Sequence, residues 1–165
     1  MRIYISGKIG EEVISDATRR KFARAEEMLK AKGYEVINPA SEKCQSLLRY
    51  SMQREEQEGH YVGDFYSFAL VTDILSIWRD CDAVYFLDDW MLSNGANVEY
   101  DFTWAIKKRM FFASRDGACT YLLCRMCREA RESGKPIDAD EILSDKAKEA
   151  YCEAHLHEAW LPIDE

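Results

Sequence analysis

Ala83-Val84-Tyr85-Phe86-Leu87 is the stretch that decides the fold of this chain. Its five apolar residues follow one another without the alternation expected of a strand with one solvent-exposed face. They therefore predict a strand buried on both faces, as in a parallel sheet covered by helices. The preceding segment fits such a sheet, because it predicts an amphipathic helix whose apolar residues recur at helical spacing, at Leu70, Ile74, Ile77 and Trp78.

Two further strands are predicted nearer the N-terminus. Ile3-Tyr4-Ile5-Ser6 is a short β-type run that leads into the turn Gly7-Lys8-Ile9-Gly10. A helix follows, which we expect to be capped by Asp16 and ended by Gly33. Residues 34–37 predict the second strand.

The rest of the first two thirds of the chain continues this alternation. Residues 41–63 are polar and predict a helix and a flexible loop, and residues 110–113 predict a fourth strand. Short loops between such elements imply right-handed crossovers. We therefore predict a flavodoxin- or Rossmann-like three-layer α/β sandwich with a parallel sheet of four to five strands. A helix opened by Gly95 is predicted to bury Val98, Phe102, Ala105 and Ile106.

Beyond Asp116 the sequence becomes helical. Residues 120–131 and 144–160 predict two helices, with Gly134-Lys135-Pro136 between them. The predicted organisation is an α/β domain over residues 1–115 and a helical C-terminal extension over residues 116–165, packed on the same domain.

Composition and charge restrict the partners of the protein. The 165 residues are 47% hydrophobic and have a formal net charge of −8, which disfavours a nucleic-acid polymer because phosphate backbones require a basic face. The sequence has no apolar run of membrane-spanning length, and its first residues begin a strand pattern rather than a signal peptide. We expect a cytoplasmic protein with a small-molecule partner, no membrane partner, and assembly into a dimer or higher homo-oligomer.

Six cysteines, at positions 44, 81, 119, 124, 127 and 152, are expected to be reduced thiols. Cys124 and Cys127, followed by Cys152 and His155, would offer four zinc ligands. Both pairs fall in predicted helices, and the segment between them is longer than in the usual zinc finger. We therefore expect no metal, and interpret these residues as thiols that pack helices and a surface histidine.

The stretch Ser93-Asn94-Gly95-Ala96-Asn97-Val98-Glu99-Tyr100 contains the clearest chemical signal. It is predicted to place Glu99 in the first turn of a helix that is entered through a glycine turn. The helix dipole and the free backbone N–H groups would keep this carboxylate ionised, and Gly95 would let a substrate approach the backbone closely. Such a group can act as a nucleophile toward a sugar carbon. The alternative is that Glu99 only stabilises its helix.

Other unusual residues follow the predicted strands, where open parallel sheets bind their ligands. The loop at residues 7–10 follows the first strand, and the segment at residues 88–95 follows the third. Lys8, which lies between two glycines, could bind a phosphate together with backbone N–H groups. The alternative is an ordinary strand-to-helix turn.

Six motifs follow one another along the chain, Ile3-Tyr4-Ile5-Ser6-Gly7, Gly33-Tyr34-Glu35-Val36-Ile37-Asn38-Pro39, Asp73-Ile74, Cys81-Asp82-Ala83-Val84-Tyr85-Phe86-Leu87, Trp90 and Ser93-Asn94-Gly95-Ala96-Asn97-Val98-Glu99. Taken in order, they resemble the nucleoside 2-deoxyribosyltransferase superfamily, and in particular a bacterial and phage-associated branch of it. The resemblance covers residues 1–115 and implies an enzyme that needs no metal or cofactor.

The resemblance implies roles for three residues. The nucleophilic glutamate of the family falls on Glu99, and the first-strand tyrosine that holds this glutamate falls on Tyr4. The aspartate that contacts the base and assists its departure falls on Asp73, which lies at the edge of the apolar stripe of its predicted helix. The alternatives are a solvated helix acid for Asp73 and a core aromatic with a polar tip for Tyr4.

Ser93 departs from the transferase pattern, which has an aspartate at this position. The chain is similar here to the 2′-deoxynucleoside 5′-phosphate N-hydrolases of the same superfamily, whose serine lies beside the phosphate. A hydroxyl can donate to a phosphate that a carboxylate would repel, so Ser93 and Lys8 favour a nucleotide. Asp88 and Asp89 could instead contact a free sugar hydroxyl. The expected substrate-binding residues are Ser6, Gly7, Lys8, Asp89, Ser93 and Gly95.

The function expected from this resemblance is cleavage or transfer at the N-glycosidic bond of a (deoxy)nucleotide or nucleoside. Glu99 would attack C1′ while Asp73 helps the base leave, and water or a second base would then release the sugar. The alternative is a sensor or regulatory module that binds a nucleotide without converting it, because fold alone does not determine function.

Overall fold

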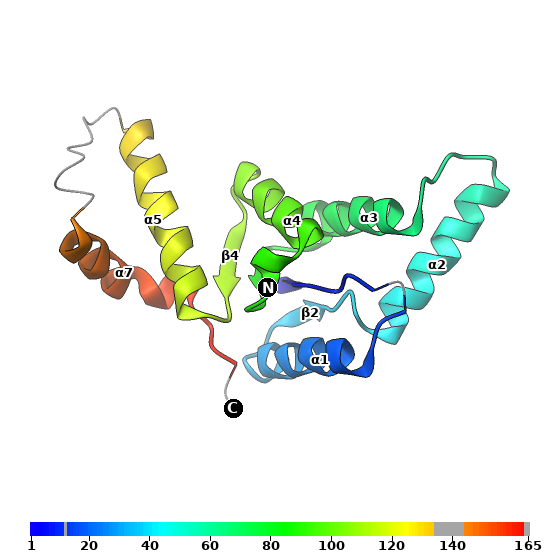
Figure 1. Ribbon diagram of the computed structural model, residues 1–165, viewed down its shortest axis with the longest axis horizontal. Coiled ribbons are helices and arrows are strands. Elements are labelled where there is room, and N and C mark those ends of the chain that lie inside the picture. The colour runs from blue at the N-terminus through cyan, green and yellow to red at the C-terminus, as the bar shows by residue number, and fades with distance from the viewer. Residues whose placement is uncertain (12, 134–143, 164–165) are drawn as a thin grey trace. The chain divides into compact units, whose positions relative to one another are not determined.

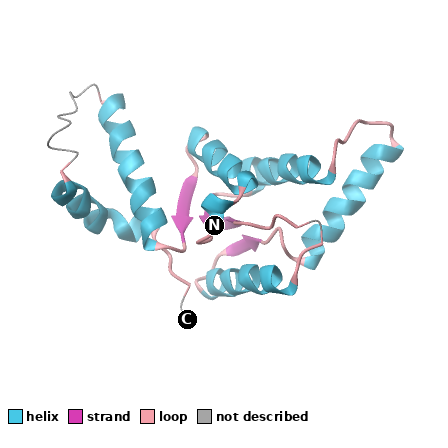
Figure 2. Cartoon of the chain, in the orientation of Figure 1, coloured by secondary structure: helices cyan, strands magenta, loops and turns pink. Residues whose placement is uncertain are grey.

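The fold is described by a computed structural model over residues 1–11, 13–133 and 144–163. Figure 1 shows the ribbon and Figure 2 distinguishes helices, strands and loops. None of the helices in these ranges is long and apolar enough to cross a membrane. The elements in chain order are β1 (Arg2–Ser6), α1 (Asp16–Ala31), β2 (Glu35–Ile37), α2 (Glu42–Gln57), α3 (Phe65–Asp80), β3 (Ala83–Phe86), η1 (Trp90–Leu92), α4 (Asn94–Ala105), β4 (Arg109–Phe112), α5 (Arg115–Glu132) and α7 (Asp145–Ala159).

The four strands form one parallel sheet in the order β2-β1-β3-β4. Tyr4 of β1 lies opposite Ile37 of β2 and opposite Val84 of β3. All four residues of β3 are buried, as the uninterrupted apolar run predicted. The predicted α/β fold with a parallel sheet is therefore confirmed. The sheet has four strands, the smaller of the two predicted numbers. The strand order reverses between β1 and β3, and ligands of such sheets bind at this switch point.

Helices cover the sheet in a way that follows from its connections. The crossover from β1 to β2 and the crossover from β2 back to β3 run in opposite directions, so right-handedness places α1 and α3 on opposite faces. Figure 1 shows α1 on one side of β2, and α3 with α4 on the other. Because side chains alternate along a strand, Ile3 and Ile5 face one layer of helices, and Tyr4 and Ser6 face the other.

The helix ends agree with the predictions in most places. The loop between α1 and β2 turns at Gly33, whose φ is +84°, a value that favours glycine. The predicted helix and loop at residues 41–63 are present as α2 and the segment that follows it. The predicted N-cap Asp16 is wrong. Ser15 caps α1 by accepting from the backbone N–H of Thr18, and Asp16 is the first helical residue, where its charge still favours the helix N-terminus.

Two expectations for α4 are also wrong. The helix begins at Asn94 with Ser93 as its N-cap, so Gly95 lies inside the helix and Glu99 lies in the second turn rather than the first. The predicted apolar stripe is not the buried face, because Val98 and Ala105 are exposed. The helix instead turns three other residues inward, and Glu99 is the middle one of them. The buried residues of α4 are Ala96, Glu99 and Thr103.

The chain divides into two compact units, Met1–Met110 together with Ile163, and Phe111–Pro162. In the second unit α5 packs against α7, where Arg125 forms an ion pair with Glu158 at 2.7 Å. Trp160 pairs with Phe112 in a parallel bridge. The division lies a few residues before the predicted boundary at residue 115, and the packing of the helical extension on the domain stays a prediction. Gly134-Lys135-Pro136 lies outside the described residues.

Candidate active site

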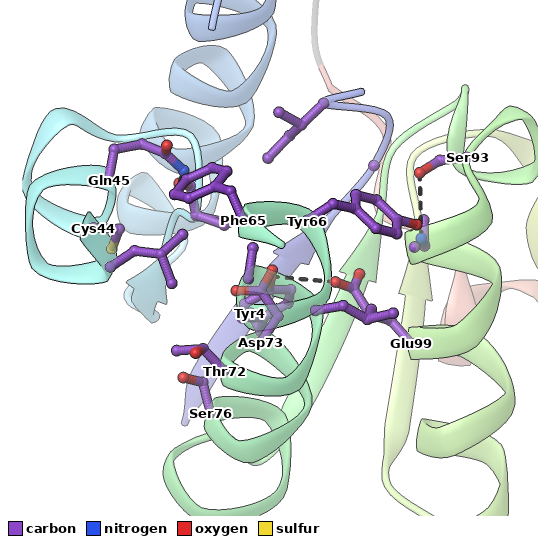
Figure 3. A pocket seen from close by; sticks show the side chains of 18 of the residues that line it. Tyr4, Cys44, Gln45, Phe65, Tyr66, Thr72, Asp73, Ser76, Ser93 and Glu99 are labelled. Carbon is purple, nitrogen blue, oxygen red and sulfur yellow. Dashed lines mark hydrogen bonds between the residues drawn. The ribbon is translucent and has the colours of Figure 1, made fainter. Parts of the chain in front are cut away.

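A cavity of about 740 Å³ lies within the unit Met1–Met110. Its wall includes Gly7 after β1, Pro39 after β2 and Ser93 after β3, which places it at the carboxyl edge of the sheet. The helices α2 and α3 and the start of α4 complete the wall (Figure 3). This volume is typical of a pocket for a small organic ligand.

Two carboxyl groups and one phenol meet at the wall of this cavity. The hydroxyl group of Tyr4 donates a hydrogen bond to Oε1 of Glu99 at 3.4 Å, and the carboxyl group of Asp73 lies beside the same hydroxyl group (Figure 3). Figure 3 shows Asp73 and Glu99 approaching Tyr4 from two different helices. Tyr4 therefore bridges the two acids, and the structure brings together the three residues expected to be catalytic.

Ser6 contacts the same glutamate from the other side. Its Oγ donates to Oε2 of Glu99 at 2.5 Å, and both side chains are buried. The described residues that line the cavity do not include Ser6. The structure therefore places this expected substrate-binding residue behind Glu99, where it holds the carboxyl group.

The fold explains why these four side chains meet. Strand alternation directs Tyr4 and Ser6 to the same face of β1. That face is covered by α3, which packs on β1 and on α4, so Asp73 and Glu99 lie on neighbouring helices above the strand. The hydroxyl group of Thr103 donates to the backbone carbonyl of Glu99 at 2.6 Å, one turn further along α4.

Burial governs the protonation of this group of side chains. Burial raises the pKa of Glu99, and the nearby Asp73 raises it further, while the hydrogen bonds from Ser6 and Tyr4 lower it. Burial also raises the pKa of Asp73, which the hydrogen bond with Tyr4 partly offsets. The pKa of Tyr4 lies well above its usual value because the ring is buried beside both acids. The expectation that the helix N-terminus keeps Glu99 ionised is thus wrong, because Glu99 lies beyond the first turn.

Three more expected site residues line the cavity. Ser93 accepts a hydrogen bond from the backbone N–H of Ala96 at 3.3 Å, so its own hydroxyl proton remains available as a donor. Gly95 follows it, and a methyl group at this position would lie 3.4 Å from the hydroxyl oxygen of Tyr66. Gly7 allows the loop after β1 to approach the end of β3, because a Cβ there would lie 2.8 Å from Cδ1 of Leu87.

Lys8 and Asp89 are not brought to the cavity. Lys8 is exposed, and its backbone N–H donates to Oδ1 of Asp89 at 3.2 Å. The other oxygen of Asp89 forms an ion pair with Lys21 of α1 at 2.5 Å. Asp89 therefore anchors the loop after β1, and neither residue belongs to the described cavity wall.

The sequence did not point to several side chains of the wall. Phe65 and Tyr66 come from the first turn of α3, after its N-cap Asp64, and Gln45 comes from α2. The amide N–H of Gln45 donates to the carbonyl of Pro39 at 2.9 Å. The capping acid followed by two aromatic residues is a sequence signal for the start of a helix, and it could have extended the predicted helix back to Phe65.

The charge of the cavity is negative. Glu11, Asp64, Asp73 and Glu99 line it, whereas none of its lining residues in the described ranges is a lysine, arginine or histidine. Backbone N–H groups that donate to Glu11 and Asp64 lower the pKa of both acids, so these two are ionised at neutral pH. The guanidinium group of Arg49 lies over the ring of Phe65, 4.6 Å from the centroid, but Arg49 is not part of the wall.

The four residues weighed as zinc ligands do not form a group that could hold a metal ion in the described part of the chain. Cys124 is exposed, Cys152 is buried with its thiol 3.8 Å from the carbonyl oxygen of Cys119, and His155 hydrogen-bonds Glu158 at 2.7 Å. A different trio brings possible ligand atoms within 4.8 Å of one another, and its members lie at the end of α2 and just beyond it. The trio consists of Glu55, Glu58 and His60.

The sheet and the cavity define an α/β protein with a candidate small-molecule site at a topological switch point. The family described as Domain of unknown function (DUF4406) matches residues 1–112, and the chain belongs to this family. The match includes every residue of the cavity wall and ends at the last residue of β4. Neither the curated proteins nor the solved structures contain a significant match to the chain.

Proposed function

We propose that the protein breaks the N-glycosidic bond of a nucleoside through a covalent intermediate on Glu99. The observation that supports this most directly is the contact of Glu99 and Asp73 with one hydroxyl group, that of Tyr4, at the wall of the cavity. Retaining cleavage of glycosidic bonds uses such a pair of carboxyl groups, one as nucleophile and one as acid. The resemblance to the nucleoside 2-deoxyribosyltransferase superfamily assigns the same roles to the same residues.

The first step forms one bond and breaks another. A carboxylate oxygen of Glu99 attacks C1′ of the sugar, and the electron pair of the N-glycosidic bond moves to the nitrogen of the base. Asp73, whose pKa is raised by burial, supplies the proton that this nitrogen takes up. The products are a free base and a glycosyl ester of Glu99.

The second step restores the enzyme. The oxygen of a water molecule attacks C1′ and displaces the carboxylate of Glu99, and Asp73 takes up the proton that the water loses. If a second base replaces water, its nitrogen attacks C1′, displaces the carboxylate of Glu99 and loses its proton to Asp73, and the reaction is a transfer. Both outcomes use the same residues.

The charge of the cavity favours a nucleoside over a nucleotide. A 5′-phosphate would enter a site whose wall includes ionised Glu11 and Asp64 and, among the described residues, no cationic side chain. Like charges in such a site repel one another. The hydroxyl group of Ser93 suits a sugar hydroxyl equally well. We therefore replace the nucleotide expected from Ser93 and Lys8 with an unphosphorylated substrate.

A chromatographic screen for base release tests the proposal. The wild-type protein is incubated with ribo- and deoxynucleosides and with their 5′-monophosphates, with and without a second free base. Release of free base, or exchange of one base for another, supports the proposal. If no base is released while a nucleoside raises the melting temperature, the protein is a binding module and the proposal fails.

A further inference from the structure

Four oxygen-bearing groups form an unbroken chain at the site. It runs from Ser6 to Glu99, then to Tyr4, and then to Asp73. Glu99 is buried and Asp73 is half-buried, and a phenol has only one proton to donate. If both acids were ionised, Tyr4 could donate to one of them only, and its oxygen would face the other. One proton shared between Asp73 and Glu99 satisfies every contact.

The shared proton has two possible positions. If Asp73 holds it, Asp73 donates to the oxygen of Tyr4, Tyr4 donates to Glu99, and Glu99 is the ionised acid. If Glu99 holds it, the Tyr4 contacts reverse and Asp73 is ionised. Tyr4 fits either arrangement, so Tyr4 alone does not decide between them.

Ser6 distinguishes the two positions. Its hydroxyl group donates to Oε2 of Glu99 at 2.5 Å, and no contact that the structure gives for Asp73 matches it. A hydrogen bond to an ionised carboxylate is roughly twice as strong as one to a neutral acceptor. We infer that Ser6 is the positioning residue that keeps Glu99 ionised and directs the shared proton to Asp73.

Burial and the neighbouring Asp73 raise the pKa of Glu99, and the hydrogen bonds from Ser6 and Tyr4 counter this rise. The ionisable groups that face Glu99 are Tyr4 on β1 and Asp73 on α3, and the cavity adds Glu11 and Asp64. No cation of the described cavity wall favours ionisation of one acid over the other. The inference rests on the proposed function for its chemical consequence, since Glu99 must be ionised to attack C1′ and Asp73 must be protonated to release the base.

Carbon-13 NMR of the carboxyl groups in the substrate-free protein tests the inference. Asp73→Asn and Glu99→Gln assign the two signals, and each signal is followed against pH in the wild type, in Ser6→Ala and in Ser6→Thr. In the wild type Glu99 should ionise at lower pH than Asp73. Ser6→Ala should make the carboxyl group of Glu99 about tenfold less acidic, the change expected from the loss of one charge-assisted hydrogen bond. Ser6→Thr should restore the acidity of Glu99.

Thr103→Val is the matched control. It also removes a buried hydroxyl group that contacts Glu99, but this hydroxyl group donates to the backbone carbonyl and not to the carboxyl group. The pH values at which Asp73 and Glu99 ionise should therefore be the same as in the wild type. If Ser6→Ala does not fold, Ser6→Cys, with a much weaker donor, replaces it. The inference is overturned if Asp73 ionises first in the wild type, or if the Glu99 titration is the same in Ser6→Ala.

Enzyme kinetics give a second measurement. In Ser6→Ala the acidic limb of the kcat profile should move to higher pH, whereas a purely structural loss would lower the whole profile without moving the limb. The NMR experiment needs no substrate, so it separates the two proposals. If the titration order holds and no base is released, the proposed function fails and the placement of the proton stands. If base is released and Ser6→Ala leaves the Glu99 titration unchanged, only the inference fails.

Discussion

Ser6 and Glu99 are joined by a 2.5 Å hydrogen bond although they lie 93 positions apart in the chain. The bond connects the last residue of β1 to the buried face of α4. It fixes one oxygen of the carboxyl group while Tyr4 contacts the other. A buried acid held at both oxygens, beside a cavity and a second acid, is the central feature of this site.

Replacement of Glu99 tests the proposed nucleophile. Glu99→Gln should lower the rate of base release by about 10³-fold or more, because the amide cannot form the glycosyl ester. The free energy of unfolding should be unchanged or slightly higher, since the variant no longer buries an ionisable group. Asp101→Asn, which alters an exposed acid on the same helix, is the control and should keep full activity. An active Glu99→Gln would exclude Glu99 as the nucleophile.

The bridging hydroxyl group can be removed without loss of the ring. Tyr4→Phe keeps the buried ring of Tyr4 but leaves the two acids without their shared partner. A hydrogen bond to a charged group contributes ~1.5–3 kcal/mol, so kcat should fall by roughly tenfold to a hundredfold while KM changes little. Steady-state kinetics measure this. A change confined to KM would mean that Tyr4 binds substrate and does not hold the catalytic acids.

The charge of the cavity predicts substrate preference. A nucleoside should be converted with a kcat/KM at least about tenfold above that of its 5′-monophosphate, because ionised Glu11 and Asp64 repel the phosphate. Glu11→Gln removes one of these charges and keeps an oxygen that can accept from the backbone N–H of Ser15. This variant should have a smaller difference in kcat/KM between the nucleoside and its 5′-monophosphate. Faster conversion of the monophosphate by the wild type would favour the nucleotide expected from Ser93.

The raised pKa values of Asp73 and Glu99 predict how stability depends on pH. Above about pH 4 a carboxyl group of the unfolded chain has lost its proton, while the buried pair still holds one. The folded state then binds more protons, so the free energy of unfolding should fall as the pH rises, until the buried pair is ionised as well. Urea unfolding between pH 4 and pH 9 measures this.

Asp73→Asn is the comparison for this pH series. It removes one acid of the pair. The decrease in the free energy of unfolding over this pH range should therefore be smaller by ~1 kcal/mol or more, which corresponds to one unit of pKa. Identical pH profiles for the wild type and Asp73→Asn would mean that Asp73 is not protonated in the folded protein.

The strands and the parallel sheet could be predicted because they depend on local patterns. The apolar run at residues 83–87 and the glycine at the end of α1 need no long-range information. The buried face of α4 could not be predicted in this way. Its inward side presents Glu99, so the rule that apolar stripes face the core identified the wrong side.

The candidate site could be predicted only in part, because several of its contacts join residues that lie far apart in the sequence. Strand alternation directs Tyr4 and Ser6 to one face, but the partner of Ser6 lies on a helix far along the chain. Lys8 was expected in the cavity because it lies between glycines, whereas the ion pair between Asp89 and Lys21 holds its loop elsewhere. Long-range pairing of this kind is absent from local sequence patterns.

The most direct test of the central claim is to trap the glycosyl ester on Glu99. A nucleoside with fluorine at C2′ slows the breakdown of such an ester, because fluorine destabilises the oxocarbenium-like transition state that follows. Intact mass spectrometry should show one sugar added per chain, and peptide mapping should locate it on Glu99, with no adduct in Glu99→Gln. Release of natural base without an adduct, or an adduct on another residue, would contradict the account.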